Sequence, residues 1–111
     1  MTPNNLEKLL SSPEQFKEIW IEGDKGQRIC ALINNDIGWL MYLRYEGDAG
    51  YSTRNPSIET KEEIEFVLDN GQREVYPKNW TYPLSILKSA LLSFMNNSEL
   101  PNQVSWHDDS A

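Results

Sequence analysis

The sequence predicts an α+β fold in which one antiparallel sheet of about five to six strands carries a short N-terminal helix and a longer C-terminal helix on one face. Short apolar or alternating runs joined by turn residues fill residues 16–76. A long helical pattern occurs only once, near the C-terminus. This order disfavours a parallel sheet, because parallel crossovers require strands that alternate with helices.

Chain length limits this fold to one domain, residues 1–111. A chain of 111 residues buries roughly 60–70% of its unfolded surface and has no material for a second core. The apolar fraction is 39%, with four Trp, five Tyr and three Phe. We therefore expect an ordered protein with an aromatic core or binding face.

Residues 1–12 are expected to form the N-terminal helix. Thr2 is suited to cap it and Pro3 to occupy its first position, and the Ser11-Ser12-Pro13 sequence stops it. The helical spacing places Leu6, Leu9 and Leu10 on one face, which we expect to dock on the sheet.

The strands are expected within residues 16–76. Ile19 and Ile21 alternate with Trp20, and a turn at residues 23–26 leads into a second run at 28–33, so these runs form a hairpin. The stretch from residue 39 to 45 is apolar on both sides until Arg44, and we expect it to be the best-buried, central strand.

A second hairpin is predicted around Asn70-Gly71, which is a strong hairpin turn signal. The alternation in residues 63–68 places Ile64, Phe66 and Leu68 on one face. Residues 73–76 are expected to form the second strand of this hairpin. Pro77 ends the pairing because proline has no N–H to donate.

The C-terminal third is expected to hold the main helix, a last strand and a tail. Residues 83–97 carry a wide apolar stripe at helical spacing. Val104 and Trp106 then alternate with polar residues, which predicts a strand over 102–106. Residues 107–111 are expected to be a flexible tail.

Charge and cysteine content indicate the partner and the compartment. The net charge is −7, from 17 acidic and 10 basic residues, which argues against direct binding to nucleic acid or an anionic membrane and favours a basic protein partner. The chain has neither an apolar run of ~20 residues nor a signal-peptide pattern. Cys30 is the only cysteine, so no intrachain disulfide is possible, and we expect a cytoplasmic protein.

Catalytic motifs are nearly absent, and we predict no enzyme activity, no cofactor and no metal. His107 is the only histidine and lies near the end of the chain. Cys30 lies in an apolar run, where a thiol is usually a small buried hydrophobe. No Cys/His metal spacing, calcium loop or glycine-rich phosphate loop occurs.

A pair of carboxylates leaves one enzymatic alternative open. Glu63 and Glu65 lie two residues apart and therefore on one face of the predicted strand. A carboxylate-dependent hydrolase would need such a pair in a cleft with one desolvated member. A solvated strand face shows the same spacing.

Acidity is concentrated between residues 46 and 74. This stretch holds eight acidic residues and three basic ones, so it carries −5 of the total charge of −7. An acidic face would speed and orient docking of a basic partner. Tyr45 and Tyr51 flank its first loop and could supply aromatic anchors. The predicted partner-binding residues are Tyr45, Glu46, Asp48, Tyr51, Glu63, Glu65, Asp69 and Glu74.

Several segments of the chain, in their order along the sequence, resemble bacterial immunity protein family 1 over residues 29–106. They are the 39–45 strand, Gly50-Tyr51-Ser52, Gly71, Tyr76-Pro77, the 84–94 helix and the segment from Pro101 to Trp106. Family tails often read Gly-x-Arg-Pro before the last strand. Here that position reads Ser98-Glu99-Leu100-Pro101, without the glycine and the arginine.

The resemblance implies a cytoplasmic inhibitor without catalysis, in a polymorphic toxin system used in competition between bacteria. Such a protein binds the C-terminal domain of a cognate secreted toxin, often a nucleic-acid deaminase, and covers its active site or substrate groove. It implies a monomer that forms a heterodimer with its toxin. The alternative from charge and size alone is a small acidic secretion chaperone or adaptor, which would present an apolar groove and usually dimerise.

Overall fold

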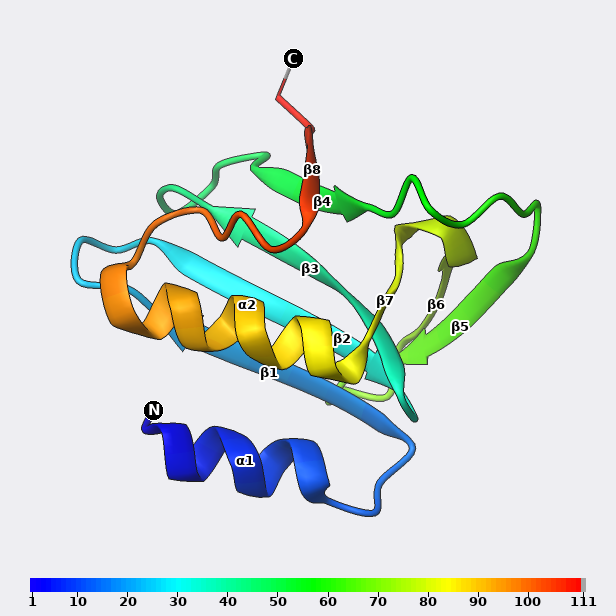
Figure 1. Ribbon diagram of the computed structural model, residues 1–111, viewed down its shortest axis with the longest axis horizontal. Helices are drawn as coiled ribbons and strands as arrows, with labels where there is room; N and C mark the ends of the chain where they lie inside the picture. The colour runs from blue at the N-terminus through cyan, green and yellow to red at the C-terminus, as the bar shows by residue number, and fades with distance from the viewer. Residues whose placement is uncertain (111) are drawn as a thin grey trace.

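A computed structural model describes residues 1–110, and it has three layers (Figure 1). Two helices lie on one face of a six-stranded sheet, and a separate two-stranded hairpin lies on the other. Every strand pair is antiparallel. The predicted α+β class, with a short N-terminal helix and a C-terminal helix, is therefore confirmed.

The strand order of the large sheet is β1-β2-β3-β4-β8, with the short β7 paired to β3 beside β4. The elements are α1 (Pro3–Ser11), β1 (Phe16–Glu22), β2 (Arg28–Asn34), β3 (Ile37–Leu43), β4 (Tyr51–Arg54), β5 (Glu63–Val67), β6 (Arg73–Pro77), a 3-10 turn (Lys78–Trp80), β7 (Tyr82–Pro83), α2 (Leu84–Asn97) and β8 (Ser105–Asp108). No helix within residues 1–110 is long and apolar enough to cross a membrane.

Helix α1 begins as its sequence predicts, because the Thr2 side chain accepts a hydrogen bond from the Asn5 N–H at 3.1 Å. Leu6 and Leu10 are buried against the sheet. The expectation for Leu9 was wrong, since 40% of this residue is exposed. Leu6 and Leu10, four residues apart, form the buried line of a short helix, and Leu9 lies beside that line.

Strand β2 is buried on both faces. Ile29, Ala31 and Ile33 face the helices, whereas Cys30 and Leu32 face the hairpin. The expectation that residues 39–45 would form the best-buried strand was wrong, because β3 keeps three half-buried positions and β2 keeps only its two ends. The apolar run of β2 is continuous because each face has its own cover.

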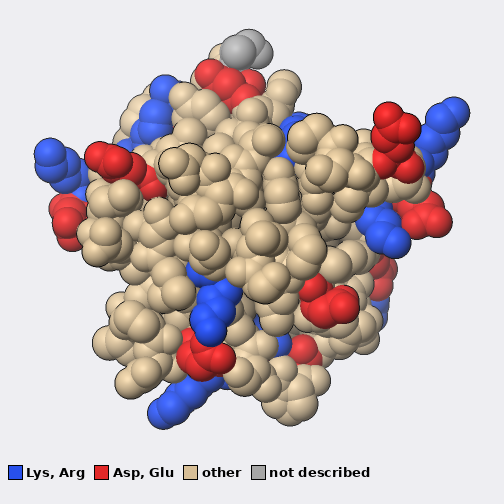
Figure 2. All heavy atoms as spheres, viewed as in Figure 1, with Lys and Arg blue, Asp and Glu red and all other residues tan. Residues whose placement is uncertain are grey.

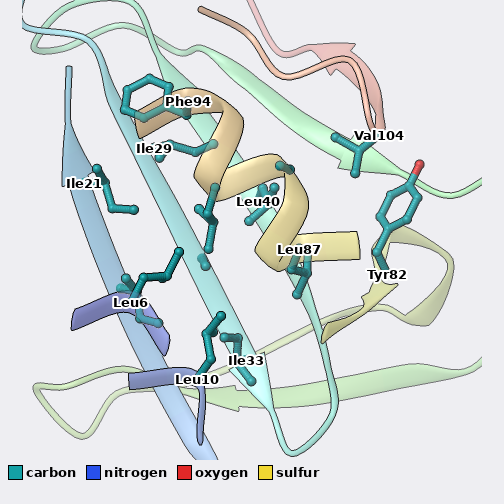
Figure 3. Close-up of a cluster of buried hydrophobic side chains, with 14 of the residues drawn as sticks. Leu6, Leu10, Ile21, Ile29, Ile33, Leu40, Tyr82, Leu87, Phe94 and Val104 are labelled. Carbon is teal, nitrogen blue, oxygen red and sulfur yellow. The ribbon is translucent and has the colours of Figure 1, made fainter. Parts of the chain in front are cut away.

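The helix-side core joins both helices to the sheet (Figure 3). Leu87 and Phe94 of α2 are fully buried there, as is Leu40 of β3. Helix α2 ends at Ser98, which takes the left-handed conformation with φ of 59° and donates its N–H to Phe94. Serine thus occupies a conformation that usually favours glycine, and its hydroxyl accepts the Asp24 N–H at 2.9 Å.

The β5–β6 hairpin forms where Asn70-Gly71 predicts it, and Gly71 has a φ of 87°. It is not part of the large sheet, which the sequence-based expectation of one sheet did not foresee. The hairpin instead packs on the face of the sheet, where Phe66 and Ile64 lie in one hydrophobic cluster with Leu32 and Trp39. The alternation in β5 fixes which side chains face inward, but not whether the hairpin pairs with or packs on another strand.

The last strand is Ser105–Asp108 rather than residues 102–106, and residues 107 and 108 are not part of a flexible tail. His107 and Asp108 pair with Ser52 and Tyr51 of β4. The shift arises because the Trp106 indole N–H donates to the Pro101 carbonyl at 2.6 Å, which holds residues 101–106 in a compact turn before the strand.

We predict that Phe66→Ala lowers the free energy of unfolding by about 3–5 kcal/mol, because it removes a fully buried ring that joins the hairpin to the sheet. Urea denaturation would measure this change. The matched control is Val67→Ala in the same strand, on its outward face, with an expected loss of less than about 1 kcal/mol. Equal losses would contradict the packing of the hairpin through Phe66.

Candidate protein-interaction surface

The predicted partner-binding residues fall into two groups at opposite ends of the sheet. The loop of residues 44–50 follows Leu43, which pairs with Arg28 at one end of β2. The hairpin lies toward the other end, where the Asn34 side chain donates to the Glu65 carbonyl at 2.8 Å. A seven-residue strand such as β2 spans about 20 Å. The structure therefore does not bring the two groups into contact.

In the loop group, Tyr45 and Glu46 are exposed, with 58% of Tyr45 accessible. Asp48 is different, because its side chain is only 1% exposed. Its carboxylate accepts two hydrogen bonds from the Arg44 guanidinium, at 2.8 and 2.9 Å, and one from the Arg44 backbone N–H at 3.0 Å. Asp48 thus closes the loop and presents no free charge to a partner.

Tyr51 is half-buried and packs against the helix-side core, with its ring 6.2 Å from that of Tyr42. The Arg44 guanidinium lies over its ring at 5.3 Å. Gly50 precedes it with a φ of 72°, and a Cβ there would lie 2.3 Å from the Tyr42 carbonyl oxygen. Glycine is therefore required at this position for the chain to turn from the loop into β4.

In the hairpin group, Glu63 and Asp69 are exposed and have no ion-pair partner within residues 1–110. Glu65 pairs with Arg73 at 2.6 Å across the outward face of the hairpin. Glu74 is half-buried and accepts hydrogen bonds from the neutral Tyr76 hydroxyl and Gln72 amide, so it keeps its negative charge uncompensated.

Between the two groups lies a part of the sheet that the hairpin leaves uncovered. Trp20 of β1 is 40% exposed there, and the Arg28 guanidinium lies over its ring at 5.2 Å. Glu18 accepts hydrogen bonds from the Trp20 indole N–H at 2.7 Å and from the Asp69 N–H at 3.0 Å. Sequence reasoning missed Trp20 and Glu18. The alternation of β1 placed Trp20 opposite Ile19 and Ile21, but it could not show that this face is open.

A shallow hollow of about 340 Å³ lies at the Arg28 end of this surface. Arg28 and Glu22 line it from the sheet, Lys25 from the β1–β2 turn, and Tyr45 and Glu46 from the loop. The loop group thus lies next to the open sheet surface. We use the name far face for this side of the sheet, opposite the helices, including the hairpin.

The arrangement offers little for catalysis. Burial, followed by the nearby charges of Glu18 and Asp69, raises the pKa of the Cys30 thiol far above its usual range, so the nucleophilic thiolate does not form. Glu65 forms an ion pair with Arg73, and Glu63 is exposed to solvent at the start of β5, so neither carboxylate is the desolvated member that a hydrolase needs. Within residues 1–110 no group of three or more His, Cys, Asp and Glu side chains could hold a metal.

The helix side differs from the far face in charge. Helix α2 contains Lys88 as its only charged residue. Figure 2 shows this side, where the middle has few charged side chains and most of them lie toward the rim. The concentration of acidic residues in the 46–74 stretch therefore does not extend over the exposed surface of α2.

We predict that Asp48 makes folding stability depend on pH. The hydrogen bonds from Arg44 hold the pKa of this carboxyl well below its usual range. A lowered folded-state pKa stabilises the protein above the unfolded-state pKa of about 3.9, and this stabilisation is lost as the pH falls toward the folded-state value. Asp48→Asn should therefore be less stable than wild type at pH 7 and lose less stability on acidification to about pH 3.

Urea unfolding of both proteins at the two pH values measures this difference. The control is Glu46→Gln, an exposed carboxyl in the same loop, which should keep the wild-type pH dependence. A wild-type pH dependence in Asp48→Asn would show that another group is responsible.

Comparison with known protein families identifies the family of this chain. A protein-family model described as immunity protein Imm1 matches residues 9–108, which covers all strands, α2 and the end of α1. No curated protein matches the chain. The match includes both groups of predicted partner-binding residues and the open part of the far face. Since it extends over most of the sequence, the chain belongs to the Imm1 immunity protein family.

Proposed function

We propose that this immunity protein binds a cognate toxin domain with a basic groove, and that the toxin acts on nucleic acid, with a deaminase as the leading candidate. A nucleic-acid deaminase must hold a polyanion, so its groove is expected to be basic. An acidic protein that covers such a groove competes with the substrate for the same positive charges. The inhibition requires binding and no catalysis.

The observation that carries this proposal is the uncompensated acidity of the 46–74 stretch. Three of its eight acidic residues form ion pairs: Asp48, Glu62 and Glu65. The remaining five have no such partner within the described residues. Complementary charges across an interface orient a partner and speed its encounter. These five residues are Glu46, Glu59, Glu63, Asp69 and Glu74.

Aromatic side chains on the same side supply anchors. Trp20 and Tyr45 are both large, exposed and held in place by an arginine over the ring. Trp and Tyr are the residue types that most often dominate binding energy at protein interfaces. A standard interface buries about 800 Å² per partner, which is wide enough to reach from Tyr45 across Trp20 to the hairpin. Asp48 and Tyr51 support the loop from within.

The proposal includes the compartment and the stoichiometry. A toxin that acts on nucleic acid meets its substrate in the cytoplasm, and we place the immunity protein there. The chain would be a monomer that forms a heterodimer with the toxin domain. Its net charge of −7 opposes self-association and favours a basic partner.

The first test is co-expression with the toxin domain encoded next to the gene of this chain. We expect restored growth and a one-to-one complex on size-exclusion chromatography. Catalytic assays of the purified immunity protein alone on nucleic acid should give no turnover. Failure to form a complex together with failure to restore growth would overturn the proposal.

The second test reverses charge on the hairpin. Glu63→Lys combined with Asp69→Lys should lower the association rate about tenfold at low salt and weaken its salt dependence, because both carboxylates are exposed and unpaired. Stopped-flow fluorescence would measure the rate. The matched control is Glu99→Lys, an exposed residue after α2, which should leave the rate within about twofold. The control reverses one charge and the test variant two, so a control effect half as large on a logarithmic scale would show that only net charge matters.

A further inference from the structure

The outer edge of β1 is an unpaired strand edge. β1 is the terminal strand of the large sheet and pairs only with β2. The Asn35 N–H donates to the Gln15 carbonyl, and the Gly23 N–H donates to the Gln27 carbonyl. Because antiparallel hydrogen-bonded pairs alternate, odd-numbered residues of β1 face β2 and even-numbered ones direct their N–H and C=O groups outward. The outward residues are Phe16, Glu18, Trp20 and Glu22.

Within the described chain, these outward backbone groups form no hydrogen bond. The edge is seven residues long and contains no proline. The opposite edge strand, β8, has only four residues. Natural sheets usually shorten, bulge or cover such an edge, because it is a template for another strand. An uncovered edge of this length is therefore a candidate docking site.

Hollows lie along this edge and provide space for side chains. One of about 730 Å³ is lined by Met1 and Leu9 of the N-terminal segment, Trp20 and Ile21 of β1, and Met95 of α2. Trp20 and Ile21 point to opposite faces, so this hollow wraps around the edge. A second hollow, of about 180 Å³, lies farther along β1 and is lined by Leu9, Ile19 and Glu18. Leu9, the apolar residue that α1 leaves exposed, lines both.

The charges along the edge select the occupant. Glu18 and Glu22 project from β1 onto the far face, and Asp69 and Glu14 line the smaller hollow. The Lys17 ammonium is buried and donates to the Leu10 carbonyl, so it does not offset these carboxylates at the surface. Arg28 lies opposite Glu22 and Lys8 lines the larger hollow, so the four carboxylates outnumber two accessible cations. A strand added here would meet Glu18 and Glu22 on the far face. On the helix face it would meet a hollow in which Leu9 and Met95 lie beside the polar side chains of Asn5 and Lys8.

A second copy of this chain fits poorly on this edge. Antiparallel pairing of two β1 strands about a two-fold axis would place Glu18 and Glu22 of both copies on the same face of the joined sheet. Four glutamates would then crowd along the new strand pair, and like charges across strands are destabilising. The edge therefore disfavours its own copy and favours a basic partner.

We propose that the outer edge of β1 accepts an extended segment of the toxin domain as an additional strand, in which basic and apolar residues alternate. Backbone hydrogen bonds to Phe16, Glu18, Trp20 and Glu22 provide affinity, as in other complexes formed by strand addition. The basic side chains face Glu18 and Glu22, and the apolar ones enter the hollow beside Leu9 and Met95. This inference rests on the proposed toxin-binding function and specifies where the toxin docks.

Amide hydrogen exchange by NMR tests the inference on the purified full chain, free and in complex with the toxin domain. We expect the outward amides of residues 16, 18, 20 and 22 to exchange rapidly in the free protein and slowly in the complex. The amides of Lys17, Ile19 and Ile21 face β2 and should be protected in both states. They provide the internal control.

A proline substitution gives an independent test. Glu22→Pro removes an outward N–H and leaves the inward ladder of β1 intact, whereas Glu22→Ala removes the same carboxylate and keeps the N–H. Glu22 makes no side-chain hydrogen bond or ion pair within residues 1–110. The proline variant should bind the toxin domain about tenfold more weakly than the alanine variant. We expect this difference to come from faster dissociation of the proline variant.

The outcomes separate the two proposals. A complex that restores growth while the outward amides still exchange rapidly would overturn strand addition and leave the immunity function standing. Equal affinities of Glu22→Pro and Glu22→Ala would do the same. Protection of the outward amides in the free protein, with a concentration-dependent dimer in sedimentation, would assign the edge to a second copy. Absence of any complex would overturn both proposals.

Discussion

The two-sided burial of β2 is the constraint on which the rest of the structure depends. Its residues alternate between the helix-side core and the hairpin-side core, so the sheet needs a cover on each face. Two helices cover one face completely enough to bury Ile29, Ala31 and Ile33. The other face receives only a hairpin of two five-residue strands. This small cover protects Leu32 and Trp39 but does not reach Trp20, and the open far face is the consequence.

Sequence patterns predicted both helices, the β1–β2 hairpin and the β5–β6 hairpin because the causes of these elements are local. Thr2 and Pro3 determine where α1 begins, and Asn70-Gly71 determines the hairpin turn. The patterns did not predict that the hairpin packs on the sheet instead of pairing with it. That choice depends on Phe66 meeting Trp39, residues that are distant in sequence. The register of β8 was missed for a similar reason, since the bond from Trp106 to Pro101 compacts a segment that an alternating pattern describes as extended.

The sequence predicted the acidic surface only in part, for a related reason. Charge can be counted from a sequence, but whether a carboxylate is free depends on its neighbours. Asp48 counts as acidic, yet Arg44, four residues earlier, neutralises it and uses it to close the loop. Glu18 was absent from the expected surface, although the structure places its carboxylate against the hairpin turn at Asp69. Trp20 was assigned to the correct face of β1, but only the size of the hairpin shows that this face stays open.

Acidity on this chain has two physical effects that reinforce each other. An open seven-residue strand edge would ordinarily invite self-association, and the glutamates of β1 make pairing with an identical chain unfavourable. In the complex that we propose, the same carboxylates, together with those of the hairpin, attract a basic partner and orient it on the far face. A surface that repels its own copy while leaving backbone donors and acceptors unpaired is therefore selective for a partner of opposite charge. In the complex that we propose, this combination would favour the toxin domain over a second copy of the chain.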